Sequence, residues 1–94
     1  MQRITEKHLA AKINTLNVVM GTPLEPWHKV NGRLVAHEGN YHIDGAFGGW
    51  QLHQMAVGGG ANNVFGLGYM SRRELCDLID VYMRGIDAER KRIK

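Results

Sequence analysis

The chain has 94 residues, of which 44% are hydrophobic and 22% are charged, and it contains one cysteine, Cys76. This length predicts a single domain over residues 1–94, and one cysteine excludes a disulfide within the chain. Twelve basic residues against nine acidic ones give a net charge of +3, too small to predict nucleic-acid binding by itself. No apolar run is long enough to cross a bilayer and the first residues lack the apolar segment of a signal peptide, so we expect neither a membrane protein nor a secreted one.

The first predicted element is a helix from Thr5 to about Met20. Thr5 is a favourable N-cap, and Gly21 followed by Pro23 is typical of a helix end. Between them, apolar side chains recur at helical spacing and predict one buried stripe. The stripe consists of Leu9, Ile13, Leu16 and Met20.

Two hairpins are predicted next. Asn31-Gly32 is a sequence that two-residue type I′ turns prefer, and it would join strands over 27–30 and 33–38. A turn within 45–49 would join a third strand, Tyr41 to Asp44, to a fourth, Trp50 to Val57. On the first hairpin, the face better suited to the core carries Trp27, Leu34 and Ala36.

The last predicted element is a second helix that begins after Ser71 and runs to about Arg90. The sequence 71–74 is a capping box, with serine at the N-cap and Glu74 three residues later. Its apolar stripe is Leu75, Leu78, Ile79, Tyr82 and Ile86. The whole pattern predicts the α+β class, with two helices flanking a small antiparallel β-meander in the order α-β-β-β-β-α.

The clearest functional signal is the glycine-rich segment 58–68, which leads into the second helix. Glycines and a helix N-terminus can present backbone N–H groups to an anion, and arginine side chains suit phosphate. Aromatic rings among the glycines could stack on a nucleobase. The predicted ligand-binding residues are Ser71, Arg72, Arg73, Asn62, Asn63, Tyr41, Phe47 and Tyr69. Trp50 and Phe65 are better core candidates. The alternative is that Ser71 and Glu74 satisfy the N–H groups internally and the arginines are solvated.

Catalytic and metal-binding interpretations have less support. The histidines include His28, His37, His42 and His53, but no Cys-x-x-Cys or His-x-x-x-His pair accompanies them. No nucleophile stands in a specific pattern with a base and a third orienting group. We therefore predict no catalytic residue, no metal and no cofactor. The basic segment 90–94 either contacts an acidic partner or nucleic acid, or is a solvated helix end.

Three segments, 4–9, 39–49 and 72–75, resemble small accessory proteins encoded by tailed bacteriophages, most specifically in Gly39-Asn40-Tyr41-His42. The resemblance implies expression in the bacterial host cytoplasm, where such proteins often disable host defences. They do so by binding a host protein or by sequestering a nucleotide immune signal. The predicted architecture is also distantly similar to that of anti-Thoeris signal sponges, although no binding residue can be transferred from them.

Together these observations predict a non-enzymatic phage accessory protein that binds an anionic, nucleotide-like ligand and works as a homo-oligomer. The thin core that a chain of 94 residues can form favours oligomerisation. One alternative is a protein-interaction module that inhibits a host enzyme through its sheet edge or first helix. The other is a nucleic-acid-binding protein, which the small net charge does not favour.

Overall fold

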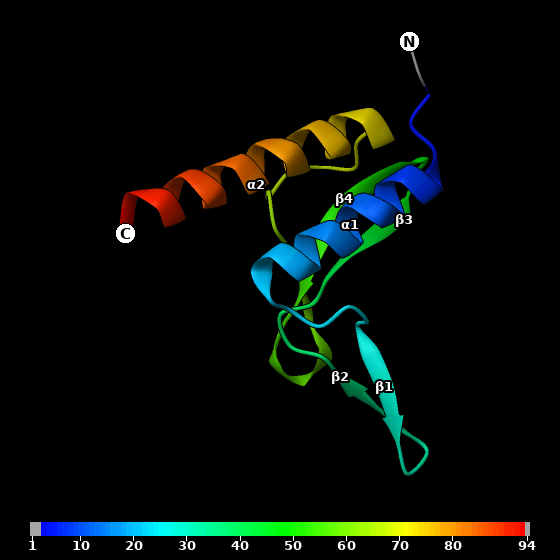
Figure 1. Ribbon diagram of the computed structural model, residues 1–94. Helices are drawn as coiled ribbons and strands as arrows, with labels where there is room; N and C mark the ends of the chain where they lie inside the picture. Colours follow the sequence, from blue (N-terminus) through cyan, green and yellow to red (C-terminus); the bar gives the residue numbers. More distant parts are fainter. Residues whose placement is uncertain (1–2, 94) are drawn as a thin grey trace.

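The computed structural model describes residues 3–93 (Figure 1). Its elements are α1 (Glu6–Met20), β1 (Trp27–Val30), β2 (Arg33–Ala36), β3 (Tyr41–Ala46), β4 (Gly49–Met55), the short 3-10 helix η1 (Val57–Gly59), β5 (Ala61–Asn63) and α2 (Arg72–Ile93). The strands form two antiparallel sheets, ordered β1-β2 and β3-β4-β5, and with the helices they confirm the predicted α+β class. Two details differ from the prediction: β1 and β2 form a sheet of their own, and β5 lies in a segment expected to be a loop.

The two helices pack against the three-stranded sheet. α1 contacts β3, α2 contacts β4, and the two helices also contact each other. Most of both apolar stripes packs into this interface, against the side chains that the pleat of β3 and β4 presents to it; Leu78 and Ile86 of the second stripe are not part of the core cluster. The buried core is formed by Leu9, Ile13, Leu16, Tyr41, Leu52, Leu75, Cys76 and Ile79.

Both helices begin at the predicted capping residues. The Thr5 hydroxyl oxygen accepts the backbone N–H of His8 at 3.1 Å, and Gly21 ends α1 with φ of +70°. At the start of α2, the Ser71 hydroxyl oxygen accepts the backbone N–H of Glu74 at 3.1 Å. The Glu74 carboxylate in turn accepts the backbone N–H of Ser71 at 3.4 Å, which completes the predicted capping box.

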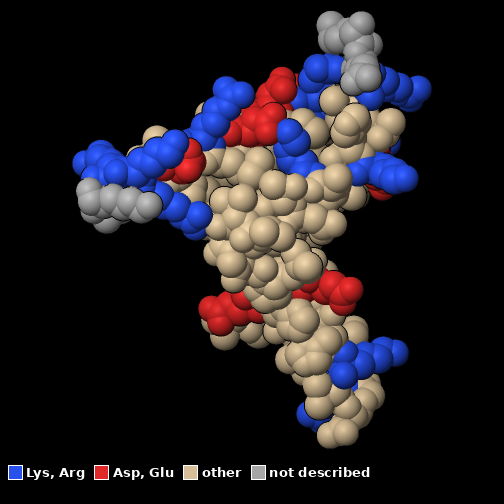
Figure 2. Space-filling view, in the orientation of Figure 1, with Lys and Arg blue, Asp and Glu red and all other residues tan. Residues whose placement is uncertain are grey.

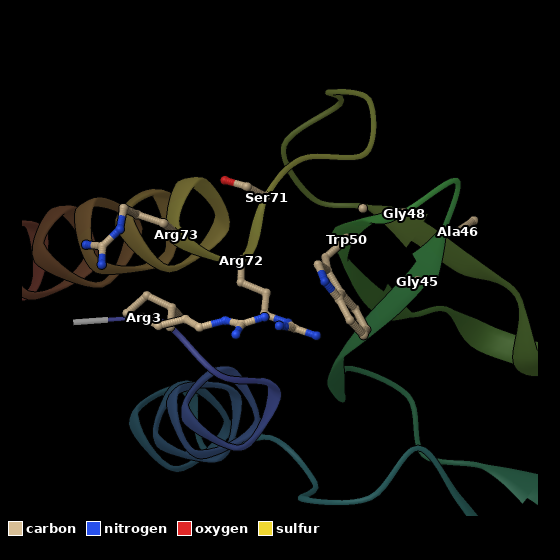
Figure 3. A pocket seen from close by; sticks show the side chains of 10 residues that line it. Arg3, Gly45, Ala46, Gly48, Trp50, Ser71, Arg72 and Arg73 are labelled. Carbon is tan, nitrogen blue, oxygen red and sulfur yellow. The ribbon is translucent and has the colours of Figure 1, made fainter. Parts of the chain in front are cut away.

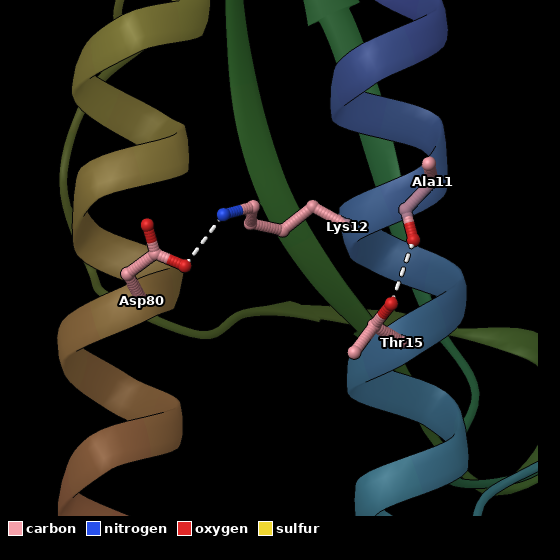
Figure 4. Close-up of polar contacts among 4 residues, drawn as sticks. All are labelled: Ala11, Lys12, Thr15 and Asp80. Atoms are coloured by element: carbon pink, nitrogen blue, oxygen red, sulfur yellow. Dashed lines mark hydrogen bonds and ion pairs between the residues drawn. The ribbon is translucent and has the colours of Figure 1, made fainter.

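Two polar contacts fix α1 to its neighbours. The buried Asn17 side chain donates to the carbonyl of Tyr41 at 2.9 Å and accepts the N–H of Tyr41 at 2.8 Å, which pairs both backbone groups at the start of β3. Between the helices, the Lys12 ammonium donates to the Asp80 carboxylate at 2.6 Å (Figure 4). The register of α1 on the sheet is therefore set by a buried hydrogen-bonded pair and not by apolar packing alone.

The β1–β2 hairpin projects from the rest of the molecule (Figure 1). Its register places Val30 opposite Arg33, and φ is +51° at Asn31 and +79° at Gly32, as the predicted type I′ turn requires. The projection helps to raise the radius of gyration to 14.2 Å, above the roughly 12 Å expected of a compact chain of this length.

The expectation that one face of this hairpin belongs to the core is wrong. Trp27 is 38% exposed and Leu34 is 62% exposed. Among the described residues neither helix lies over the hairpin (Figure 1). The short helix η1 packs against its base, where Gly59 lies so close to the Trp27 ring that an added Cβ would be 2.8 Å from it. The alternation of apolar residues in β1 and β2 therefore does not correspond to a buried face.

Candidate functional site

A cleft lies where the turn between β3 and β4 meets the start of α2. It has a volume of about 820 Å³, within the range of small-molecule sites, and is lined by residues 3–4, 45–46, 48–50 and 71–73. This lining includes three arginines, Arg3, Arg72 and Arg73, and no carboxylate. The cleft therefore combines a concave shape with positive charge.

Glycines bring the segments that form the cleft close together. A Cβ at Gly45 would lie 2.9 Å from the indole of Trp50, and one at Gly49 would lie 2.9 Å from the Cβ of Tyr69. The backbones of Trp50 and Met70 also exchange two hydrogen bonds, at 2.8 and 2.9 Å. Because Met70 immediately precedes the cap of α2, this bridge fixes the first turn of the helix beside the indole.

Arg72 makes the most informative contact in the cleft. Its guanidinium carbon lies 5.4 Å from the centre of the Trp50 ring, a cation–π geometry. Its Nε atom is buried and has no hydrogen-bond partner among the described residues. A buried, unsatisfied N–H on a cation is costly, because water solvated it in the unfolded chain. An acceptor supplied by a ligand would remove that cost.

The other two arginines differ in direction. Figure 3 shows Arg3, from the segment before α1, extending toward the same space as Arg72, in front of Trp50. Arg73 is directed away from the indole in the same view. Within residues 3–93, neither Arg3 nor Arg72 forms an ion pair. The structure thus places two guanidinium groups together without a neutralising acid.

The expected cradle of backbone N–H groups is not formed. Ser71 and Glu74 satisfy each other at the helix start, which is the alternative that the sequence left open. The glycines at 58–60 lie beside the base of the β1–β2 hairpin, where Gly59 packs on Trp27, and not beside α2. The positive charge of the cleft comes from arginine side chains.

Three predicted ligand-binding residues lie outside the cleft. Asn62 and Asn63 pair with Gln54 and His53 in the sheet, several residues along β4 from the cleft. Tyr41 was expected at the surface but is 2% exposed, so that prediction is wrong. Its side chain lies in the core beneath α1, and burial together with a hydrogen bond to the Tyr82 hydroxyl raises its pKa.

Phe47 and Tyr69 form an aromatic pair beside the cleft. Their rings meet edge to face, with centroids 5.6 Å apart. The Tyr69 hydroxyl donates to the Asp44 carboxylate at 2.6 Å, and this hydrogen bond raises the pKa of Tyr69. Phe47 is 95% exposed and has φ of +52°, a strained conformation for a bulky residue. Ala46 and Gly48, its neighbours in the turn, line the cleft, whereas the Phe47 ring packs against Tyr69.

Two residues of the cleft were missed from the sequence. Trp50 was placed in the core; it does pack there in part, yet one side of its indole faces Arg72. Arg3 gives no local signal, because it precedes the N-cap in an irregular segment. Arg3 belongs to the site because the fold places it around the same cleft as the turn between β3 and β4.

Two histidines and the cysteine lie outside the cleft and have other neighbours. His42 and His53 face each other across β3 and β4; burial and the proximity of His53 lower the pKa of His42. The ring of His53 is hydrogen-bonded to Gln51 at 2.8 Å. Burial raises the pKa of the Cys76 thiol, which disfavours the reactive thiolate. In the described part of the chain, no group of three or more side chains could hold a metal ion.

No family model, curated protein or solved structure matches this chain. Neither helix among the described residues combines the length and apolarity that a membrane span requires. Function is therefore inferred from the cleft itself.

Proposed function

We propose that this protein binds a small anionic, nucleotide-like ligand in the arginine cleft, as a binding protein and not as an enzyme. The observation that carries the proposal is the buried Nε of Arg72, which lacks a partner in the described chain while a second guanidinium, from Arg3, extends toward the same space. A phosphate group supplies several acceptor oxygens and two negative charges, and guanidinium binds it through paired hydrogen bonds.

The cleft also limits how the rest of the ligand is held. One side of the Trp50 indole packs close to Gly45 and Arg72 lies over the ring, so a nucleobase has little room to stack there. Phe47, which follows the lining residue Ala46, presents an almost fully exposed ring, and a base stacked on it would gain contact without displacing any core residue. The phosphate would then lie in the cleft and the base at its edge.

The biological setting of this proposal rests on the resemblance to phage accessory proteins. There the ligand would be a nucleotide signal of the host defence, which the protein would sequester. Binding of duplex nucleic acid has less support, because two cations of the basic segment at the end of α2 are paired: Lys91 with Asp87 at 3.1 Å and Arg92 with Glu89 at 2.6 Å.

Calorimetric titration with three probes tests the proposal: adenosine diphosphate, pyrophosphate and adenosine. We expect adenosine diphosphate to bind most tightly, since its phosphates would engage the arginines and its base would stack on Phe47. Arg72→Gln and Arg3→Gln should each weaken binding by about 10- to 100-fold, because a hydrogen bond to a charged group contributes about 1.5–3 kcal/mol. Arg84→Gln, an exposed arginine of α2 outside the cleft, is the matched control and should bind like the parent.

Either of two results would contradict the proposal. One is the absence of binding for both phosphate-bearing probes; the other is an Arg72→Gln variant that binds as tightly as the parent. Salt-dependent binding of any DNA duplex, unchanged in both cleft variants, would favour the nucleic-acid alternative instead.

A further inference from the structure

The β1–β2 hairpin has no buried residue of its own. All four positions of β1 and three of β2 are exposed, and the fourth is half-buried. Apolar side chains are present on both faces, with Val30 45% and Leu34 62% exposed. Each strand pairs with a single neighbour, so each leaves one backbone edge open. A two-stranded ribbon of this kind is marginally stable in water and pairs readily with another strand.

Opposite charges are separated along this hairpin. Lys29 and Arg33 lie next to the turn, whereas Glu25 precedes β1 and Glu38 follows β2 at the base. Figure 2 shows the same distribution, with blue at the tip of the hairpin and red where it joins the body. Within residues 3–93, none of these four charges takes part in an ion pair.

We infer that the hairpin is a self-association surface whose occupant is the hairpin of a second copy of this chain, aligned antiparallel about a two-fold axis. That symmetry brings each basic tip to the acidic base of the other copy, so both pairs of opposite charges meet at once. A parallel arrangement would instead oppose like charges. An open strand edge of each copy would be covered between them.

The pattern favours this occupant over an unrelated protein because tip and base complement each other within one chain. A foreign partner would need to match only one end, and the separation of charges would then have no role. The surface is short, so the dimer is expected to be weak and to dissociate on dilution, as small interfaces do. This surface lies apart from the arginine cleft, and the inference does not depend on the proposed ligand.

Two charge-reversed variants test the inference. The first, Lys29→Glu with Arg33→Glu, makes both tip and base acidic; the second, Glu25→Lys with Glu38→Lys, makes both basic. Sedimentation equilibrium over a concentration series should show a monomer–dimer equilibrium for the parent. For each variant alone, the dissociation constant of the dimer should rise at least about tenfold, because like charges now oppose each other. An equimolar mixture should restore the dimer, since acidic tips then meet basic bases.

The mixture separates this inference from simple misfolding, because it contains only the two weakened variants. Lys7→Glu with Arg84→Glu reverses two exposed charges outside the hairpin and should dimerise like the parent. A parent that stays monomeric at every concentration, variants that dimerise like the parent, or a mixture that stays monomeric would each overturn the inference. If the parent stays monomeric at every concentration, the partner of the exposed hairpin would be a protein other than this chain.

Discussion

The chain contains two hairpins with the same kind of turn and different surroundings. Asn31-Gly32 joins β1 to β2 with φ of +51° and +79°, and Phe47-Gly48 joins β3 to β4 with φ of +52° and +72°. The first pair of strands is exposed, whereas the second lies against both helices. The two turns therefore share a similar backbone geometry, although one hairpin is exposed to solvent and the other is packed against the helices.

The difference shows what holds each hairpin together. Asparagine and glycine enter the left-handed region at little cost, so the turn sequence itself favours the first hairpin. Phenylalanine resists that region, so the second turn is not explained by its own sequence. Burial of Tyr41 and Leu52 under the helices stabilises β3 and β4 enough to impose the strained turn.

A pair of leucine substitutions should give the largest contrast between the hairpins. Leu52→Ala in β4 removes a side chain that is 1% exposed and leaves a cavity, so we expect the free energy of unfolding to fall by about 2–5 kcal/mol. Leu34→Ala in β2, 62% exposed, should change it by no more than about 0.5 kcal/mol. Urea titration of dilute protein measures both. Comparable losses would mean that the first hairpin is buried in solution.

A pair of glycine substitutions sharpens the comparison at the turns. A Cβ added at Gly32 or at Gly48 meets nothing within 4 Å, so valine at either position is disfavoured by its positive φ and not by a clash. Gly48→Val should lower the free energy of global unfolding by about 1–3 kcal/mol. Gly32→Val should speed amide exchange across 27–36 and leave global unfolding nearly unchanged, because the hairpin adds little to the core. If both substitutions lowered the free energy of global unfolding equally, the two hairpins would unfold as one cooperative unit.

The features that could be predicted from the sequence are those that neighbouring residues determine. Thr5, Ser71 and Asn31 act within three or four residues of themselves, through caps and a turn whose chemistry is local. The apolar stripes of the helices were also recognisable, because a helix repeats its buried face at fixed spacing. Which face of a strand is buried depends instead on the distant element that covers it. Leu34 fits the alternating apolar pattern of a strand, yet no helix covers it and it is exposed.

The candidate site was predictable only in part, for the same reason. Arg72 and Ser71 were identified from the junction of loop and helix, and the structure places both in the cleft. Tyr41 was assigned to the wrong surroundings, because no local pattern shows that α1 covers the start of β3. Arg3 joins the site only because the fold brings it to the same cleft as the turn between β3 and β4, a long-range arrangement without a local signature.

The smallest predicted effect concerns the strained turn of the second hairpin. Phe47→Asn replaces a ring that is 95% exposed with a residue that tolerates positive φ, and the contact it removes is the edge-to-face pair with Tyr69. We expect the free energy of unfolding to rise by about 0.5–1 kcal/mol, the range for relief of backbone strain at a compatible site. The affinity for adenosine diphosphate should fall, since stacking on an aromatic ring contributes about 1–3 kcal/mol. Urea titration and calorimetry measure the two effects on the same sample.

Phe47→Tyr is the matched control for that substitution, because it keeps both the ring and the strain. Its stability and its affinity should equal those of the parent. A gain in stability without a loss of affinity in Phe47→Asn would remove Phe47 from the ligand site and leave the arginines to bind alone. A loss of stability would mean that the contact between the Phe47 and Tyr69 rings outweighs the backbone strain at Phe47.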